Sequence, residues 1–203
     1  MIKPQKLIFI LFPLIVAQLL VLGTLRGQSK AVKILIVYYS GTGNTEKMAM
    51  GVSEGAKRVT NVVVVTKKVS DVTKEDLVSA DGIILGSPTY YANMAAPMKK
   101  FIDDWAFKYG TYFGDKVGGA FATGGDKTGG KEHVVISLLL AMMNNGMIIV
   151  GPLYEQEGTK YGVFGASAVT DRPKKGVNED ELDDARLLGE RVATVAKRFR
   201  GGQ

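Results

Sequence analysis

The chain has 203 residues, 46% of them hydrophobic, which suffices for one core of ordinary size. It has no cysteine and one histidine, which excludes disulfides, thiol catalysis, iron–sulfur clusters and most structural zinc, so we expect no metal site. The net charge is +6 for the whole chain and +3 for residues 30–203, because three of the 26 basic residues and none of the 20 acidic residues precede residue 30; this small charge does not indicate nucleic-acid binding.

An uncharged, strongly apolar segment runs from Leu7 to Leu25, with lysines before it and Arg26 behind it. A segment of this length can span a membrane as a helix. It predicts that residues 1–29 form an N-terminal hydrophobic helix and linker, acting as a membrane anchor or as a signal segment. We therefore expect the protein to be membrane-associated through this anchor, or exported if the segment is cleaved, with the side of the membrane left open.

Strand-like and helix-like segments alternate along residues 30–203. Apolar runs bounded by turn residues predict strands at 32–39, 61–69, 82–86, 116–122 and 147–150. Helical spacing of apolar residues and capping signals predict helices at 46–58, 73–80, 96–109, 132–144 and 179–199. Because parallel neighbours need helix-length connections, the alternation predicts an α/β fold with a five-stranded, mostly parallel sheet covered by helices on both faces.

The first predicted strand runs directly into the loop SGTGNT, residues 40–45, which opens a helix. N–H groups at the start of a helix attract anions, and the hydroxyl and amide side chains of the loop add donors. Glu46 stands where a dinucleotide-binding loop needs its third glycine, and the lysine of a nucleoside-triphosphate loop is absent. The loop suits a single phosphomonoester, although an ordinary turn and helix cap would use the same residue types.

Two further unusual loops follow the third and fourth predicted strands, at residues 87–98 (SPTYYANMAAPM) and 123–131 (TGGDKTGGK). Ligands of parallel sheets bind beyond the carboxyl ends of the strands, so we expect all three loops at one edge. The second loop offers aromatic rings suited to a flat conjugated system. The third is rich enough in glycine to bring backbone N–H groups close to ring carbonyls. A phosphomonoester joined to a planar heterocycle describes flavin mononucleotide (FMN).

The motifs SGTGNT, GSPTYYANMAAPMKKFID and ATGGDKTGGKE resemble, in this order, the three flavin loops of the flavodoxin-like superfamily. Within it the sequence is most similar to the WrbA-type NAD(P)H:quinone oxidoreductases, over about residues 32–200. The resemblance implies a doubly wound sheet of strand order 2-1-3-4-5, FMN as cofactor, NAD(P)H as electron donor, a quinone or similar acceptor, and a possible homo-oligomer. The alternative is a flavodoxin-type one-electron carrier that docks on protein partners.

Carried over residue by residue, the resemblance assigns the cofactor to all three loops and assigns no catalytic side chain. The phosphate would be held by Ser40, Thr42, Gly43, Asn44 and Thr45. The ribityl chain and ring would be lined by Thr89, Tyr90 and Tyr91, in a loop shaped by Pro88 and Asn93. The pyrimidine edge would be covered by Thr123, Gly124, Gly125 and Asp126.

The sequence departs from the WrbA pattern in three places. Asn144 and Asn145 stand where that family usually carries a histidine pair; an amide can donate to a quinone oxygen but cannot supply a proton near neutral pH, so Asn145 is a candidate substrate-binding residue. The segment 151–165 is shorter than in that family. Thr42 and Thr45 are more typical of flavodoxins.

Overall fold

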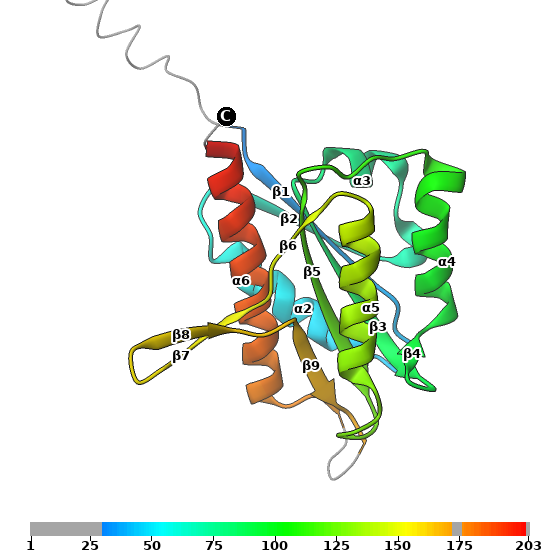
Figure 1. Ribbon diagram of the computed structural model, residues 1–203, viewed down its shortest axis with the longest axis vertical. Helices are drawn as coiled ribbons and strands as arrows, with labels where there is room; N and C mark the ends of the chain where they lie inside the picture. The colour runs from blue at the N-terminus through cyan, green and yellow to red at the C-terminus, as the bar shows by residue number, and fades with distance from the viewer. Residues whose placement is uncertain (1–29, 172–175, 202–203) are drawn as a thin grey trace, which may run out of the picture. The chain divides into compact units, whose positions relative to one another are not determined.

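A computed structural model describes residues 30–171 and 176–201 (Figure 1). The predicted N-terminal helix and linker, residues 1–29, lie outside these ranges. Within the described ranges no helix combines the length and the apolar character needed to cross a membrane. This finding overturns the membrane-associated or exported location expected from the sequence, and that location is withdrawn.

The main sheet is parallel, and its principal strands run in the order β2-β1-β3-β5-β6. Their bounds are Val32–Tyr38 for β1, Val62–Lys68 for β2, Gly82–Tyr90 for β3, Val117–Gly124 for β5 and Ile148–Ile149 for β6. β2 lies on one side of β1, and β3 and all later strands lie on the other side, so the connections change direction at β1. The predicted order 2-1-3-4-5 is confirmed. Ligands of such sheets bind beside this switch point, at the carboxyl ends of the strands.

The last position of the sheet is shared by two short strands. β6 pairs with the start of β5, whereas β9 (Ala166–Val169) pairs in parallel with its end. Between them the chain forms an antiparallel hairpin, β7 (Leu153–Gln156) and β8 (Thr159–Gly162). The sequence predicted only one strand here, because the four residues of β9 become a strand through pairing with β5.

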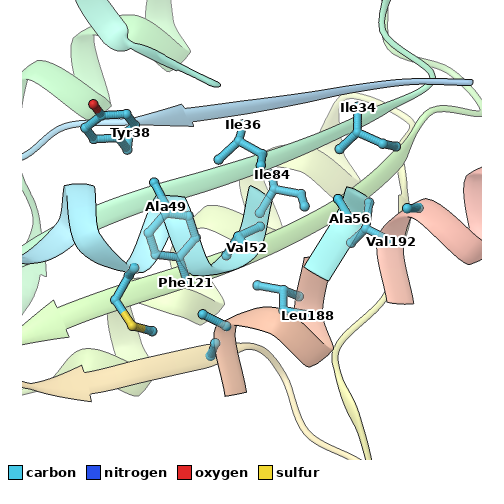
Figure 2. Packing of buried hydrophobic residues seen from close by; sticks show 14 of the residues in the cluster. Ile34, Ile36, Tyr38, Ala49, Val52, Ala56, Ile84, Phe121, Leu188 and Val192 are labelled. Carbon is cyan, nitrogen blue, oxygen red and sulfur yellow. The ribbon is translucent and has the colours of Figure 1, made fainter. Parts of the chain in front are cut away.

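Helices cover both faces of the sheet. α2 (Asn44–Lys57) and α6 (Glu179–Gly201) pack on one face, and α3 (Lys74–Ser79), α4 (Ala96–Asp104) and α5 (Lys131–Asn144) on the other. Side chains of a strand alternate between faces, so Ile34 and Ile36 face α2 and α6 whereas Leu35 and Val37 face α3 to α5. Figure 2 shows the first of these cores, where strand side chains meet those of both helices.

Glycines allow α2 and α6 to pack backbone against backbone. A Cβ atom on Gly55 of α2 would lie 1.9 Å from the carbonyl oxygen of Arg186. On α6, a Cβ atom on Gly189 would lie 1.9 Å from the carbonyl oxygen of Val52. Both distances are far below any real contact, so these positions accept only glycine without displacement of a helix. This close packing fixes α2, whose N-terminus carries the first of the three loops.

Two predicted element boundaries differ from the structure by more than two residues. β3 continues past residue 86 to Tyr90 and pairs antiparallel with the short strand β4 (Asn93–Met94), so part of the second loop is a hairpin. The helix predicted over 96–109 widens at Trp105–Tyr109 into a π-helical turn, with a 3-10 turn at Val69–Asp71 elsewhere on this face. Trp105 is buried beside Phe101 and Phe113, as expected of a core residue.

Candidate functional site

The three loops meet at the carboxyl ends of the central strands, which lie at the bottom of Figure 1. Gly41 of the first loop lies under Tyr90 of the second, so closely that a Cβ atom on Gly41 would be 2.5 Å from the tyrosine hydroxyl. A Cβ atom on Gly130 of the third loop would be 2.8 Å from the Cβ of Ala92 in the second. The convergence predicted from the sequence is therefore present.

The first loop is a concentration of hydrogen-bond donors at the start of α2. Gly43, with φ of 88°, is the N-cap residue, and no side chain caps the helix. The first-turn N–H groups of α2 are therefore available to a ligand. Within the loop, the N–H of Gly43 donates to Ser40 Oγ at 3.0 Å, and Asn44 Nδ2 donates to Thr42 Oγ1 at 3.2 Å. Together with the helix dipole, this arrangement suits an anion.

A hydrogen bond between Tyr38 and Glu46 connects the two ends of the first loop. The Tyr38 hydroxyl, at the end of β1, donates to Glu46 Oε1 in the first turn of α2 at 2.6 Å. This bond is the main reason that the pKa of Glu46 lies below its ordinary value. Burial, followed by the same bond, raises the pKa of Tyr38. The carboxylate thus stays ionised and is held by Tyr38 and by Lys68, whose Nζ lies 3.6 Å away.

Thr45 and Thr123 link the first loop to the third. Both side chains are buried, and their hydroxyl oxygens lie 2.8 Å apart in a hydrogen bond. Thr45, which was predicted to hold phosphate, shares this bond with Thr123 through its hydroxyl, and its backbone N–H lies in the first turn of α2. The bond fixes the N-terminus of α2 against the end of β5.

The second loop is a tight hairpin with unusual backbone angles. Thr89 pairs with Met94 and Tyr90 with Asn93, leaving a two-residue turn at Tyr91 and Ala92. Both turn residues have positive φ, 51° and 61°, which costs non-glycine residues free energy. Strained backbone of this kind concentrates at ligand sites. The Tyr91 side chain is fully exposed at the tip of the hairpin.

The hydroxyl of Thr89 is a buried polar group without a protein partner. Thr89 Oγ1 has no hydrogen bond within the described residues. Its Cβ lies 3.5 Å from the position that a Cβ on Gly124 would take, so Thr89 sits against the third loop. Buried hydroxyls in native proteins are almost always bonded. A ligand seated among the three loops would supply the missing partner, which is the fit expected of a bound cofactor.

The third loop is held from two directions. The N–H of Thr170, just after β9, donates to the carbonyl oxygen of Gly124 at 2.8 Å. Gly125 lies beside Asp171, with 3.5 Å between a Cβ built on the glycine and the Cβ of Asp171. Within the loop, Asp126 Oδ1 accepts from the N–H of Thr128 at 3.3 Å. Thr170 and Asp171, which directly follow β9, thus form a fourth wall of the site, which the sequence reasoning missed because β9 itself was not predicted.

Lys131 is a second residue that the sequence reasoning passed over. It is the first residue of α5 and only 3% exposed. Its ammonium group donates to the carbonyl oxygens of Asp126 and Lys127 at 2.7 and 2.9 Å. The available signal was its position, since a lysine at the start of a helix is unfavourable with respect to the helix dipole.

Asn145 does not belong to this cluster. It follows the last residue of α5, and its Nδ2 donates to the carbonyl oxygen of Ala141 at 2.8 Å. The next residue, Gly146, accepts from the N–H of Asp115, just before β5 begins. Because α5 runs antiparallel to β5, Asn145 lies at the opposite edge of the sheet from the three loops. The structure therefore does not bring Asn145 together with the other predicted site residues within one chain, and its role in substrate binding stays a prediction.

Comparison with known proteins gives the same family by three routes. A family model described as NADPH-dependent FMN reductase matches residues 56–157. A flavodoxin from Clostridium saccharobutylicum is 36% identical over 169 residues, covering 82% of this chain and 99% of the relative. An NAD(P)H dehydrogenase (quinone) from Geotalea daltonii is 32% identical over 198 residues, covering 81% of this chain and 96% of the relative.

A solved structure also matches the fold and most of the chain. The crystal structure of a flavodoxin, WrbA-like protein from Agrobacterium tumefaciens aligns with a TM-score of 0.64 and 28% identity, covering 83% of this chain and 99% of that one. With the strand order and the three converging loops, these similarities show that the chain belongs to the flavodoxin-like superfamily of FMN proteins, which includes the WrbA-type NAD(P)H:quinone oxidoreductases.

Proposed function

We propose that this chain is an FMN-dependent oxidoreductase that transfers electrons from NAD(P)H to a quinone or a similar acceptor. The observation that carries the proposal is the unpartnered hydroxyl of Thr89, buried where the second and third loops meet. When bound, FMN accepts two electrons and a proton from NAD(P)H and passes the electrons to the acceptor. The protein contributes orientation and electrostatics, so no acid–base pair of side chains is required.

The first loop binds the phosphate in this proposal. The uncapped N–H groups at the start of α2 and the amide of Asn44 donate to the phosphate oxygens, assisted by the hydroxyls of Ser40 and Thr42. Gly43 brings the backbone close because its φ of 88° would strain any side chain. A phosphomonoester matches this set of neutral donors better than a triphosphate does, since the loop contains no lysine.

The second and third loops hold the ring. Thr89 donates from the hairpin, Tyr90 and Tyr91 cover one side of the ring, and Pro88 and Asn93 shape the turn. The backbone of Gly124, Gly125 and Asp126 approaches the pyrimidine edge, steadied by the hydroxyl of Thr123 beneath it.

A one-electron carrier of the flavodoxin type is the second candidate. The Clostridium saccharobutylicum relative is named a flavodoxin, and the threonines of the first loop support this alternative. A carrier that recognises protein partners uses charged faces to steer association, and a net charge of +3 over residues 30–203 provides little steering. The enzyme is therefore the preferred candidate.

One experiment separates the two candidates. The full-length chain is purified with FMN, and the oxidation of NADH and of NADPH is followed with benzoquinone as acceptor. Rapid turnover, with a redox titration that fits a single two-electron step, supports the enzyme. Negligible turnover, with two well-separated one-electron steps in the titration, favours the carrier. Failure to retain FMN at all contradicts both.

A further inference from the structure

Lys131 is a buried cation, and both its burial and its place at the start of a helix cost free energy. Lys131 is 3% exposed, and its two hydrogen-bond partners among residues 30–171 and 176–201 are uncharged carbonyl groups. Burying an ammonium group costs free energy that neutral partners only partly recover. Its place at the start of α5 adds repulsion from the positive end of the helix dipole. Residues that break local rules in this way concentrate at functional sites.

The lysine is directly adjacent to the proposed ring-binding site. A Cβ atom on Gly124 would lie 2.8 Å from Lys131 Cγ and 3.5 Å from the Cβ of Thr89. The stem of Lys131 and the side chain with the unpartnered hydroxyl therefore flank the same glycine. Lys131 thus packs against the inner side of the third loop, close to the Thr89 side chain, whose hydroxyl has no partner within the described residues.

The ammonium group also fixes the direction of two peptide units. In a trans peptide the C=O and the following N–H point in opposite directions. The carbonyl oxygens of Asp126 and Lys127 both point at Lys131 Nζ, so the N–H groups of Lys127 and Thr128 point away from it. The carboxylate of Asp126 holds the second of these N–H groups. Lys131 therefore sets the orientation of peptide dipoles in the third loop.

We propose that Lys131 is a positioning residue that makes the third loop electropositive and thereby stabilises reduced FMN relative to oxidised FMN. The proposal rests on the function proposed above. Two electrons and one proton taken from NAD(P)H add one negative charge to the cofactor. The buried ammonium group and the N–H of Lys127, which points away from it, interact favourably with such a charge.

Three variants of the full-length chain test this role. Lys131→Met removes both the charge and the donors, and Lys131→Gln removes the charge but keeps N–H donors for the loop. Lys127→Gln is the matched control, because it removes the same charge from an exposed side chain of the same loop. The measurements are the dissociation constant of oxidised FMN, by flavin fluorescence, and the two-electron midpoint potential of the bound cofactor at pH 7.

For Lys131→Met we expect the affinity for reduced FMN to fall about tenfold more than the affinity for oxidised FMN, which corresponds to a potential about 30 mV lower. Lys131→Gln falls between the wild type and Lys131→Met, and Lys127→Gln matches the wild type. Potentials of both Lys131 variants equal to that of the wild type, with FMN still bound, would overturn the proposal.

A measurement on the wild type keeps the test independent of folding in the variants. The midpoint potential of FMN bound to the wild-type chain should lie above that of free FMN, because the reduced form is bound more tightly. A bound potential below the free value overturns the role of Lys131 even if neither variant folds. A wild-type chain that binds no FMN contradicts the proposed function instead, so the two failures are distinct.

Discussion

The hydroxyl oxygens of Thr45 and Thr123 lie 2.8 Å apart, although 78 residues separate them in the sequence. The bond joins the first turn of α2 to the end of β5, and both side chains are at most 2% exposed. It is therefore shielded from water and holds the first loop in register with the third. The relative position of the proposed phosphate and ring sites depends on this contact.

Removing one of the two hydroxyls should cost more than removing both. In Thr123→Val the hydroxyl of Thr45 stays buried without its partner, so we expect a loss of about 1 to 2 kcal/mol in the free energy of unfolding. The double variant Thr45→Val/Thr123→Val leaves no unpaired group and should be more stable than the sum of the single changes predicts, by about 1 kcal/mol. Urea unfolding of the apoprotein measures all three. Strict additivity would show that the contact is not a coupled pair.

The packing of α2 against α6 gives a second test. In Gly55→Ala the new methyl group meets the backbone of Arg186, which cannot retreat as a side chain can. We expect a loss of about 1 to 3 kcal/mol in the free energy of unfolding and weaker FMN binding, because the helix that carries the first loop must shift. Met50→Ala, at a 42% exposed position on the same helix, is the control. Equal stability of Gly55→Ala and the wild type would contradict the close approach of the two helices.

The segments that were predicted well are those whose structure is set locally. The run of apolar residues in β1 and the run of turn residues behind it identify a strand, a loop and a helix N-terminus without information from elsewhere. β9 is different, since Ala166–Val169 is a strand only because the end of β5 is unpaired beyond β6. The burial of Lys131 depends on the path of a loop, which no pattern in the sequence gives. Asn145 was assigned from its position in a family motif, although it follows α5 and precedes a parallel strand, which places it at the end of the sheet opposite to the three loops.

The capping box of α3 should make stability depend on pH. Burial alone would raise the pKa of Asp76, but hydrogen bonds from Lys67 and Thr73 outweigh it, so the folded-state pKa lies below the ordinary value. A lowered folded pKa contributes stability that is fully present above the unfolded pKa of about 3.9 and is lost as the pH falls through the folded value. Asp76→Asn should therefore cost about 1 kcal/mol at pH 7 and progressively less below pH 4.

Urea unfolding of the wild type and Asp76→Asn at pH 7, 5 and 3 checks this dependence. Asp103→Asn is the control, because Asp103 belongs to an exposed pair with Lys99 that should contribute less. A difference between wild type and Asp76→Asn that stays constant down to pH 3 would show that the carboxylate's charge does not matter to the cap.

Thr89 offers a prediction in which stability and binding change in opposite directions. Its hydroxyl is buried and unpartnered within the described residues, so Thr89→Val removes a polar group that costs free energy in the apoprotein. We expect the apoprotein to become more stable by about 1 kcal/mol and the dissociation constant of FMN to rise about tenfold, since the hydroxyl would no longer meet the cofactor.

Thr111→Val is the control, because the Thr111 hydroxyl donates to the carbonyl oxygen of Trp105 outside the site. This variant should lower stability and leave FMN affinity unchanged. Thermal unfolding and fluorescence titration give the two quantities. Unchanged FMN affinity in Thr89→Val would remove the observation on which the cofactor site chiefly rests, whereas a loss of both stability and affinity would mean that the hydroxyl already has a structural partner in the apoprotein.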